Sequence, residues 1–167
     1  MRRAFLLLAV MALALVVASG AAVAVSKTGD DGNNRLVGTN DRDTLAGGGG
    51  NDEVYGKGAR DRLYGDSGRD LVQGGGGPDQ LFGGQGFDRV FGGRGDDFIN
   101  VLDERNDVVD CGAGDFDEVY ADFEDTIRDE FECEVVLMAS AEPLGSNAGS
   151  LGPEELEGAS FVKRASP

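Results

Sequence analysis

The sequence predicts an all-β fold made of short tandem repeats, and three observations on its middle part predict it. Glycine recurs every nine residues from residue 29 to residue 92. An aspartate or asparagine follows each of these glycines five places later, and a large aliphatic residue comes two places after that. Side chains alternate between the two faces of a strand, so one aliphatic residue per repeat predicts a short strand with one inward side chain. Such units bury a continuous core only when they stack.

The repeat positions define the candidate site and the candidate core. The sixth position carries the candidate side-chain ligands, which are Asn34, Asp43, Asp52, Asp61, Asp70, Asp79, Asp88 and Asp97. The eighth position carries the candidate core residues, which are Leu36, Leu45, Val54, Leu63, Val72, Leu81, Val90 and Ile99. The first and fourth positions carry glycines that are candidate ligands through their backbone, namely Gly47, Gly50, Gly65, Gly68, Gly74, Gly77, Gly83, Gly86, Gly92 and Gly95.

Two repeats, 47–55 and 83–91, fit the pattern G-G-x-G-x-D-x-U-x, where U is a large apolar residue. At these residues the sequence resembles the RTX, or haemolysin-type calcium-binding, repeat family. The resemblance extends over residues 29–100 and implies a right-handed parallel β-roll, a solenoid in which each half-turn is a glycine-rich loop followed by a very short strand. It also implies Ca²⁺ as the bound ion, held between stacked loops by pairs such as Asp52 with Asp70 and Asp79 with Asp97.

The spacing suits calcium chemistry, because Ca²⁺ takes six to eight oxygen ligands at about 2.3–2.6 Å. Glycine lets the backbone turn its carbonyl oxygens toward one point, and the aspartate adds charge. A single aspartate could equally be a turn residue, but a turn does not require glycine at fixed offsets before it. Thr39, Asn40 and Asp41 replace glycines in the second loop, and Lys57 and Ala59 interrupt the fourth, so we expect poorer sites there. Without cations we expect largely disordered repeats.

The segment before the repeats has the order of a secretory signal peptide. A short basic start is followed by an apolar run and by small residues, which predicts cleavage after Ala24 and a linker at 25–28. The alternative is a membrane anchor, because a spanning helix needs about 20 apolar residues. Cleavage would leave no membrane span and would make the protein secreted and extracellular, either free or associated with a cell surface.

The segment after the repeats predicts a cap and a tail. Residues 101–137 contain lengthened, glycine-poor copies of the repeat, and stacked repeats need such an ending to protect their last edge. Cys111 and Cys133 are the only cysteines, and an exported protein favours a disulfide between them; two free thiols or a metal pair are the alternatives. Residues 138–167 lack any period and predict a disordered tail.

Composition restricts the function. A net charge of −16 repels nucleic acid and anionic lipid and attracts cations. The sequence has no histidine, which removes Ser-His nucleophile pairs and histidine-ligated zinc. We therefore expect a secreted calcium-binding protein that is not an enzyme, a structural or surface-interaction module whose partners are calcium ions and an extracellular surface or protein. The alternatives are a small secreted hydrolase and a calcium-dependent adhesin that uses the repeats as a scaffold.

Two weaker motifs lie within the repeats. Aromatic residues occupy the outward ninth position at Tyr55, Tyr64, Phe82 and Phe91, where they either form a stripe for a partner or pack on neighbouring repeats. Arg94-Gly95-Asp96 matches a cell-adhesion tripeptide, but the repeat pattern generates it with one chance arginine.

Overall fold

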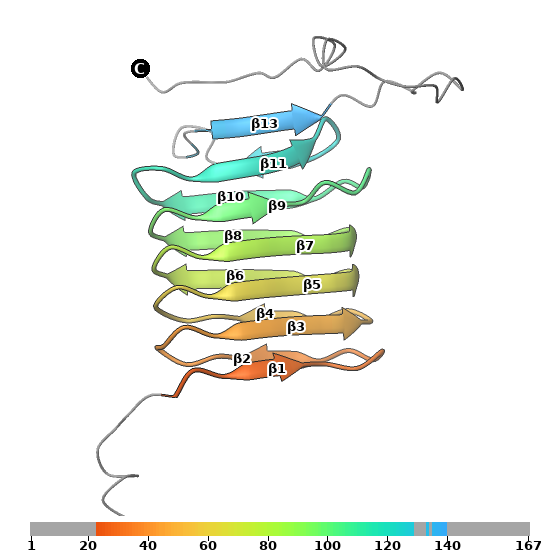
Figure 1. Cartoon of the computed structure of the whole chain (residues 1–167). Coiled ribbons are helices and arrows are strands. Elements are labelled where there is room, and N and C mark those ends of the chain that lie inside the picture. Colours follow the sequence, from red (N-terminus) through yellow and green to blue (C-terminus); the bar gives the residue numbers. More distant parts are fainter. Residues whose placement is uncertain (1–22, 129–132, 134, 140–167) are drawn as a thin grey trace, which may run out of the picture.

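The computed structural model describes residues 23–128, 133 and 135–139, and these residues form two parallel β-sheets stacked face to face (Figure 1). The seven-stranded sheet has the order β1 (Ser26–Thr28), β3 (Thr44–Gly49), β5 (Arg62–Gly68), β7 (Gln80–Gly86), β9 (Phe98–Asn100), β11 (Glu118–Asp122) and β13 (Val135–Ala139). The six-stranded sheet has the order β12 (Thr126–Arg128), β10 (Val108–Ala113), β8 (Arg89–Arg94), β6 (Leu71–Gly76), β4 (Glu53–Tyr55) and β2 (Arg35–Val37).

Successive strands alternate between the two sheets, so each full turn of the chain contains two repeats. Strand β5 pairs in parallel with β7, with Leu63 beside Leu81, which lies eighteen residues later. In Figure 1 the seven-stranded sheet runs to the right in front, the six-stranded sheet runs to the left behind, and the chain rises with each turn, which makes the solenoid right-handed. The predicted right-handed parallel β-roll is therefore confirmed, with the hand that parallel crossovers favour.

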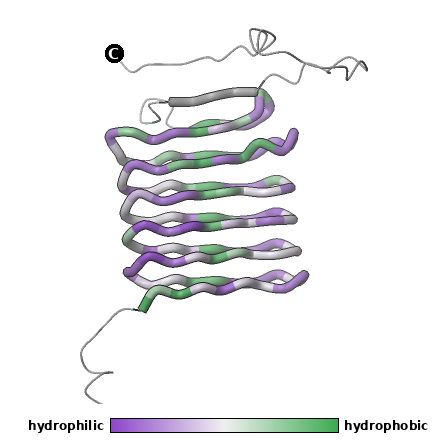
Figure 2. The backbone as a smooth tube through the Cα atoms, in the orientation of Figure 1, coloured by the Kyte–Doolittle hydropathy of each residue, from purple (hydrophilic) through white to green (hydrophobic). Residues whose placement is uncertain are grey.

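The core is a double column of aliphatic side chains between the sheets. The eighth-position residues from Leu45 to Ile99 are fully buried, and Val109 and Val119 continue them in the later turns. Figure 2 shows the hydrophobic residues in the middle of each turn and hydrophilic residues toward the loops at its sides. Because only one large side chain per half-turn is inward, the core is narrow, and the loops must contribute to holding the turns together.

The solenoid begins one strand earlier than the sequence indicates. Residues 26–28, expected to be a linker, form β1 and pair with β3, with Lys27 beside Leu45. Lys27 thus shares the register of the core residues but is exposed at the end of the stack, and its Nζ donates a hydrogen bond of 2.5 Å to the carbonyl oxygen of Val37 on the opposite sheet. A charged side chain across the open end discourages edge-to-edge pairing with another chain. The predicted linker at 25–28 is therefore wrong for residues 26–28, which the sequence hides because Lys27 stands where the later repeats have an aliphatic residue.

The outward aromatic residues do not form one stripe, because they lie on both sheets. Tyr64 on β5 stacks on Phe82 of β7 with ring centroids 4.9 Å apart. On the six-stranded sheet, Tyr55 lies 5.0 Å beneath the guanidinium of Arg35, and Phe91 lies 5.4 Å beneath that of Arg89. Tyr55 and Tyr64 thus contact residues of a neighbouring turn, and Phe91 contacts Arg89 of its own strand β8, which favours local packing over a single partner surface.

The predicted signal peptide, apart from its last two residues, and the predicted tail at 138–167, apart from residues 138 and 139, lie outside the described residues. Within the described part of the chain, no helix has the length and apolar character needed to cross a membrane.

Candidate metal centre

The sixth-position side chains form two columns on opposite sides of the solenoid. The first column lies before the strands of the six-stranded sheet and contains Asn34, Asp52, Asp70, Asp88, Asp107 and Asp125. The second column lies before the strands of the seven-stranded sheet and contains Asp43, Asp61, Asp79, Asp97 and Asp117. Both predicted ligand columns are brought together as expected, although the role of these residues as metal ligands stays a prediction.

Neighbouring members of a column are joined by a backbone-to-carboxylate hydrogen bond. The N–H of Asp52 donates to Oδ1 of Asp70 at 2.7 Å, and the N–H of Asp79 donates to Oδ1 of Asp97 at 2.7 Å. The same bond recurs along both columns, always from the earlier turn to the carboxylate of the later turn. This ladder uses one oxygen of each carboxylate and holds the side chain in a fixed orientation.

The second oxygen of most of these carboxylates has no hydrogen-bond donor. The column aspartates from Asp43 to Asp117 are almost completely buried, with a relative exposure of at most 2 %, whereas Asp125 at the end of the first column is half-buried. Oδ2 is buried without a hydrogen-bond partner in Asp52, Asp61, Asp70, Asp79, Asp88, Asp97 and Asp107. A buried carboxylate oxygen without a donor is costly, so each position calls for a cation or a proton.

Burial also makes the charged form of these carboxylates unfavourable. Loss of hydration raises the pKa of Asp61 and Asp88 to about 6, against the ladder hydrogen bonds that lower it. The same loss of hydration, together with repulsion from neighbouring aspartates of the column, raises the pKa of Asp70, Asp79 and Asp97 to about 7. A divalent cation beside the columns would reverse this effect, because it favours the ionised form.

Glycine at the first position leaves room beside each free oxygen. A Cβ built on Gly74 would lie 2.5 Å from Oδ2 of Asp79 and 2.5 Å from the carbonyl oxygen of Gly92 in the next turn. Gly47 and Gly56 face the aspartate of their own loop and a carbonyl oxygen of the following turn in the same way. Two oxygen atoms from different turns therefore face a space that any side chain would fill.

The second and fourth positions of six consecutive loops have a left-handed backbone. In the loop 47–52 the φ angles are 99° at Gly48 and 101° at Gly50, and the loops 65–70, 74–79, 83–88 and 92–97 repeat this pair. The fourth loop, 56–61, keeps the same conformation although Lys57 (φ 90°) and Ala59 (φ 69°) replace the glycines. Contrary to the expectation from sequence, this loop has the left-handed backbone of the loop 74–79 stacked on it. The N–H of Lys57 donates to the carbonyl oxygen of Gly74, and the N–H of Gly76 donates to the carbonyl oxygen of Lys57.

The columns continue beyond the predicted repeats. The N–H of Asp88 donates to Oδ1 of Asp107, and the N–H of Asp97 donates to Oδ1 of Asp117, over separations of 19 and 20 residues. Sequence reasoning missed both as ladder members because the period lengthens there. The signal was present, since each is followed two places later by a buried valine, Val109 and Val119.

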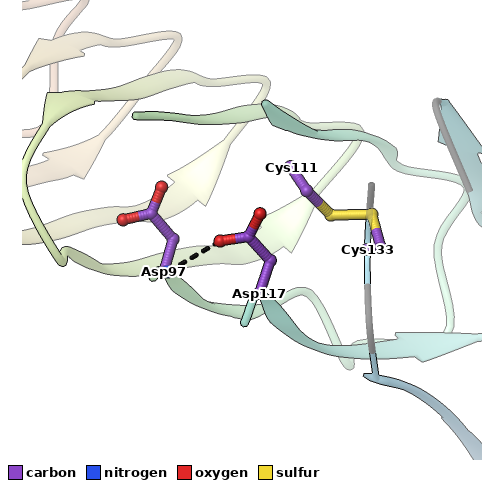
Figure 3. The surroundings of a disulfide bond; sticks show 4 residues. All are labelled: Asp97, Cys111, Asp117 and Cys133. Carbon is purple, nitrogen blue, oxygen red and sulfur yellow. Dashed lines mark hydrogen bonds between the residues drawn. A yellow bond between two sulfur atoms is a disulfide. The ribbon is translucent and has the colours of Figure 1, made fainter. Parts of the chain in front are cut away.

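A disulfide closes the core beside the last turn of the second column. Cys111 and Cys133 are bonded to each other with their Cα atoms 5.7 Å apart, which confirms the predicted pairing. Figure 3 shows this disulfide next to the stacked carboxylates of Asp97 and Asp117. Cys111 takes the place of the first-position glycine in its loop, so its buried side chain fills the space that earlier turns leave open.

The Arg94-Gly95-Asp96 tripeptide is built into a loop and is not displayed as a free tip. Oδ1 of Asp96 accepts hydrogen bonds from the N–H groups of Asp115 at 3.0 Å and Phe116 at 3.2 Å. Gly95 has the left-handed backbone of the fourth position. The aspartate that an adhesion receptor would need is therefore held by the next turn.

The donor set fits calcium. Among the described residues, no three His, Cys, Asp or Glu side chains converge to hold a metal ion, so an ion here would need backbone carbonyl oxygens besides carboxylates. Ca²⁺ accepts such a mixed set of hard oxygen ligands, whereas zinc sites use sulfur, nitrogen and carboxylate side chains. The residues that would hold calcium are the column aspartates, through their free Oδ2 atoms, and the glycine-rich loops, through their carbonyl groups.

Comparison with known families agrees with this reading. Residues 28–63 and 64–99 both match the family model described as the RTX calcium-binding nonapeptide repeat (4 copies). Neither the comparison with curated proteins nor the comparison with solved structures gave a significant match. Residues 28–99 are therefore identified as RTX calcium-binding nonapeptide repeats.

Proposed function

We propose that this chain is a secreted, non-catalytic protein whose repeats fold outside the cell on binding calcium and then serve as a rigid structural or surface-interaction module. The observation that carries the proposal is the set of buried aspartate oxygens without a donor, one per loop from Asp52 to Asp107. Bound calcium balances the negative charge of these carboxylates and contacts their free oxygens. The family match to calcium-binding repeats supports the same ion.

The residues of the chain divide the work of binding. The ladder hydrogen bonds fix one oxygen of each carboxylate and aim the other toward the glycine of the same loop. The glycines exclude side chains from that space and allow the carbonyl groups to approach. Since an ion held between two turns contacts both, its binding free energy becomes folding free energy. This coupling suits a chain that crosses a membrane unfolded and meets calcium outside.

A non-catalytic role fits the position of the acidic groups. The column carboxylates are buried inside the solenoid, where a substrate would have no access to them. The absence of histidine from the sequence leaves no Ser-His or Cys-His pair for nucleophilic catalysis. We therefore favour a module whose function depends on calcium-dependent order over a hydrolase.

The test is a calcium titration of the chain purified from culture medium, in which far-ultraviolet circular dichroism measures the strand content at each calcium concentration. We expect little strand signal in excess chelator. The strand signal should rise cooperatively at about 10⁻⁴–10⁻³ M calcium, the range typical of extracellular modules. Magnesium at the same concentration is the control ion, because it prefers a rigid octahedral shell. Mass spectrometry of the same sample reports whether the chain begins at Val25. A complete strand signal in chelator would contradict the proposal.

Two matched variants locate the binding. Asp70→Asn keeps an oxygen for the N–H of Asp52 but removes the free carboxylate oxygen, so we expect about a tenfold loss of calcium affinity at that pair of loops. Asp31→Asn removes the same charge from an exposed loop residue and should leave the affinity nearly unchanged. Equal effects of the two variants would mean that only net charge matters.

A further inference from the structure

The first two loops differ from the next six in how the sixth-position side chain is satisfied. In the loop 38–43, Oδ2 of Asp43 accepts a hydrogen bond of 2.5 Å from the N–H of Thr39 and one of 3.1 Å from its hydroxyl group. In the six loops from 47–52 to 92–97, the corresponding oxygen has no donor. Asp43 thus receives from its own loop the two donors that the other aspartates lack.

The loop 29–34 is closed by the same backbone group. The N–H of Asp30, at the second position like Thr39, donates to Oδ1 of Asn34 at 3.0 Å. The amide group of Asn34 then donates from Nδ2 to Oδ1 of Asp30 at 2.9 Å and to the carbonyl oxygen of Gly32 at 2.5 Å. A neutral amide therefore binds a carboxylate and a carbonyl oxygen of the loop, which are the kinds of oxygen that a calcium ion would bind.

The backbone explains why the two kinds of loop separate so cleanly. All six later loops have positive φ at both the second and the fourth positions. The first two loops lack positive φ at these positions, which are held by Asp30 and Gly32 in the first loop and by Thr39 and Asp41 in the second. With an ordinary φ, the second-position N–H turns onto the sixth-position side chain; with a left-handed φ, it leaves that oxygen free.

We propose that the loops 29–34 and 38–43 take no calcium, because internal N–H, amide and hydroxyl donors replace the ion, and that Thr39 is the residue that closes the second loop against it. The inference rests on the proposed function for the other loops. It removes Asn34 and Asp43 from the predicted metal ligands, although both lie within the residues that match the calcium-binding repeat family. The stack therefore starts on a turn that is complete without ions, next to the Lys27 contact across its open end.

The neighbouring turn still offers the second loop what an ion would need. A Cβ built on Gly38 would lie 2.6 Å from the carbonyl oxygen of Gly56, as first-position glycines do in later loops. Lys57 and Ala59 of that neighbouring loop already have the left-handed backbone. The obstacle therefore lies in Thr39 and Asp41, and replacing them with glycine should restore a site.

The experiment compares calcium stoichiometry by isothermal titration in the full chain and in the double variant Thr39→Gly/Asp41→Gly. We expect the double variant to bind one more ion per chain than the wild type. Asn40→Gly is the matched control, because it adds a glycine to the same loop without removing a donor to Asp43, and its stoichiometry should equal that of the wild type.

Anomalous diffraction from wild-type crystals grown in calcium supplies a second measurement that does not depend on the variant. Calcium peaks are expected beside the loops from 47–52 onward and none beside Asn34 or Asp43. A peak beside Asp43, or a wild type that binds calcium together with a double variant that gains no ion, would overturn the inference while leaving the proposed function intact. A wild type that binds no calcium would overturn both.

Discussion

Each column aspartate has two carboxylate oxygens in different environments. In Asp70, Oδ1 accepts the N–H of Asp52, whereas Oδ2 is buried without a donor. The first oxygen ties two turns together whether or not a cation is present. The second oxygen makes the buried position unfavourable whenever the carboxylate is ionised and no cation is bound. A single residue thus joins two turns and makes their stability depend on a cation or a proton.

This conflict predicts opposite effects of pH on the calcium-free and calcium-bound protein. Burial raises the pKa of Asp70, Asp79 and Asp97 from 3.8 to about 7, so the folded chain binds protons more tightly than the unfolded chain. The stabilisation by these protons is complete below pH 3.8 and is lost as the pH rises through about 7. In chelator, the strand signal should therefore grow on acidification from pH 8, whereas calcium affinity should fall below about pH 7, because calcium needs the ionised groups.

Circular dichroism and calcium titration at several pH values check this prediction. Acidification also brings the net charge toward zero near the isoelectric point of about 4.2, which favours compaction by itself. The variant Asp70→Asn/Asp79→Asn separates the two causes, since it should flatten the pH dependence in chelator more than the exposed Asp31→Asn does. A strand signal in chelator that decreases on acidification would contradict the raised pKa values.

At the scale of the single loop, backbone conformation decides what the loop can bind. The fourth loop adopts the left-handed backbone at Lys57 and Ala59 although neither is glycine. A side chain in this conformation costs roughly 1–2 kcal/mol. The loop therefore stores strain that loops with glycine at both positions avoid.

Replacing Lys57 with glycine should relieve part of this strain. We expect Lys57→Gly to stabilise the calcium-bound protein by about 1 kcal/mol in denaturant unfolding, after the greater freedom of glycine in the unfolded chain is subtracted. Ser67→Gly is the control, because Ser67 is exposed and lacks a positive φ, and it should destabilise by about 0.5–1 kcal/mol. Destabilisation by both variants to the same extent would show that Lys57 is not strained.

The loops also show how far the sequence could predict this molecule. The nine-residue period was enough to place Asp52 above Asp70 and Leu63 beside Leu81, because a strict period fixes the register of a solenoid. It could not separate the loop 38–43 from the loop 56–61, since both lack glycine at the second and fourth positions but only the loop 56–61 keeps the left-handed backbone. That difference depends on hydrogen bonds of Thr39 and on stacking between turns, which a linear pattern does not contain. The longer spacing before Asp107 and Asp117 hid them for the same reason.

At the scale of the whole molecule, the two ends are secured in different ways. The first turn is completed by internal donors and by Lys27, and the last turns are joined by the disulfide between Cys111 and Cys133. The loops between them, from that of Asp52 to that of Asp107, have the free carboxylate oxygens. We infer that calcium controls the middle of the solenoid more than its ends.

Removal of the disulfide tests this division. A bridge over the 22-residue separation stabilises by roughly 3 kcal/mol in the chain-entropy model, so the Cys111→Ala/Cys133→Ala variant should melt at a lower temperature in calcium. Its calcium stoichiometry should stay that of the wild type, because neither cysteine belongs to the loops 47–52 to 92–97. Wild type treated with a reductant is the control for the small cavity that alanine leaves at the buried Cys111. An unchanged melting temperature in both samples would remove the capping role.

The direction of the ladder has a consequence for the order in which the turns can form during synthesis. Every rung runs from an amide of one turn to a carboxylate that comes eighteen to twenty residues later in the chain. In a polypeptide that emerges amino end first, the amide of one turn cannot form its ladder hydrogen bond until the following turn has emerged. Each newly emerged turn therefore stabilises the turn before it. The turns of the solenoid therefore close in order from the amino end to the carboxyl end. A chain whose synthesis stops midway leaves its last turn without the carboxylate that would bind its amide.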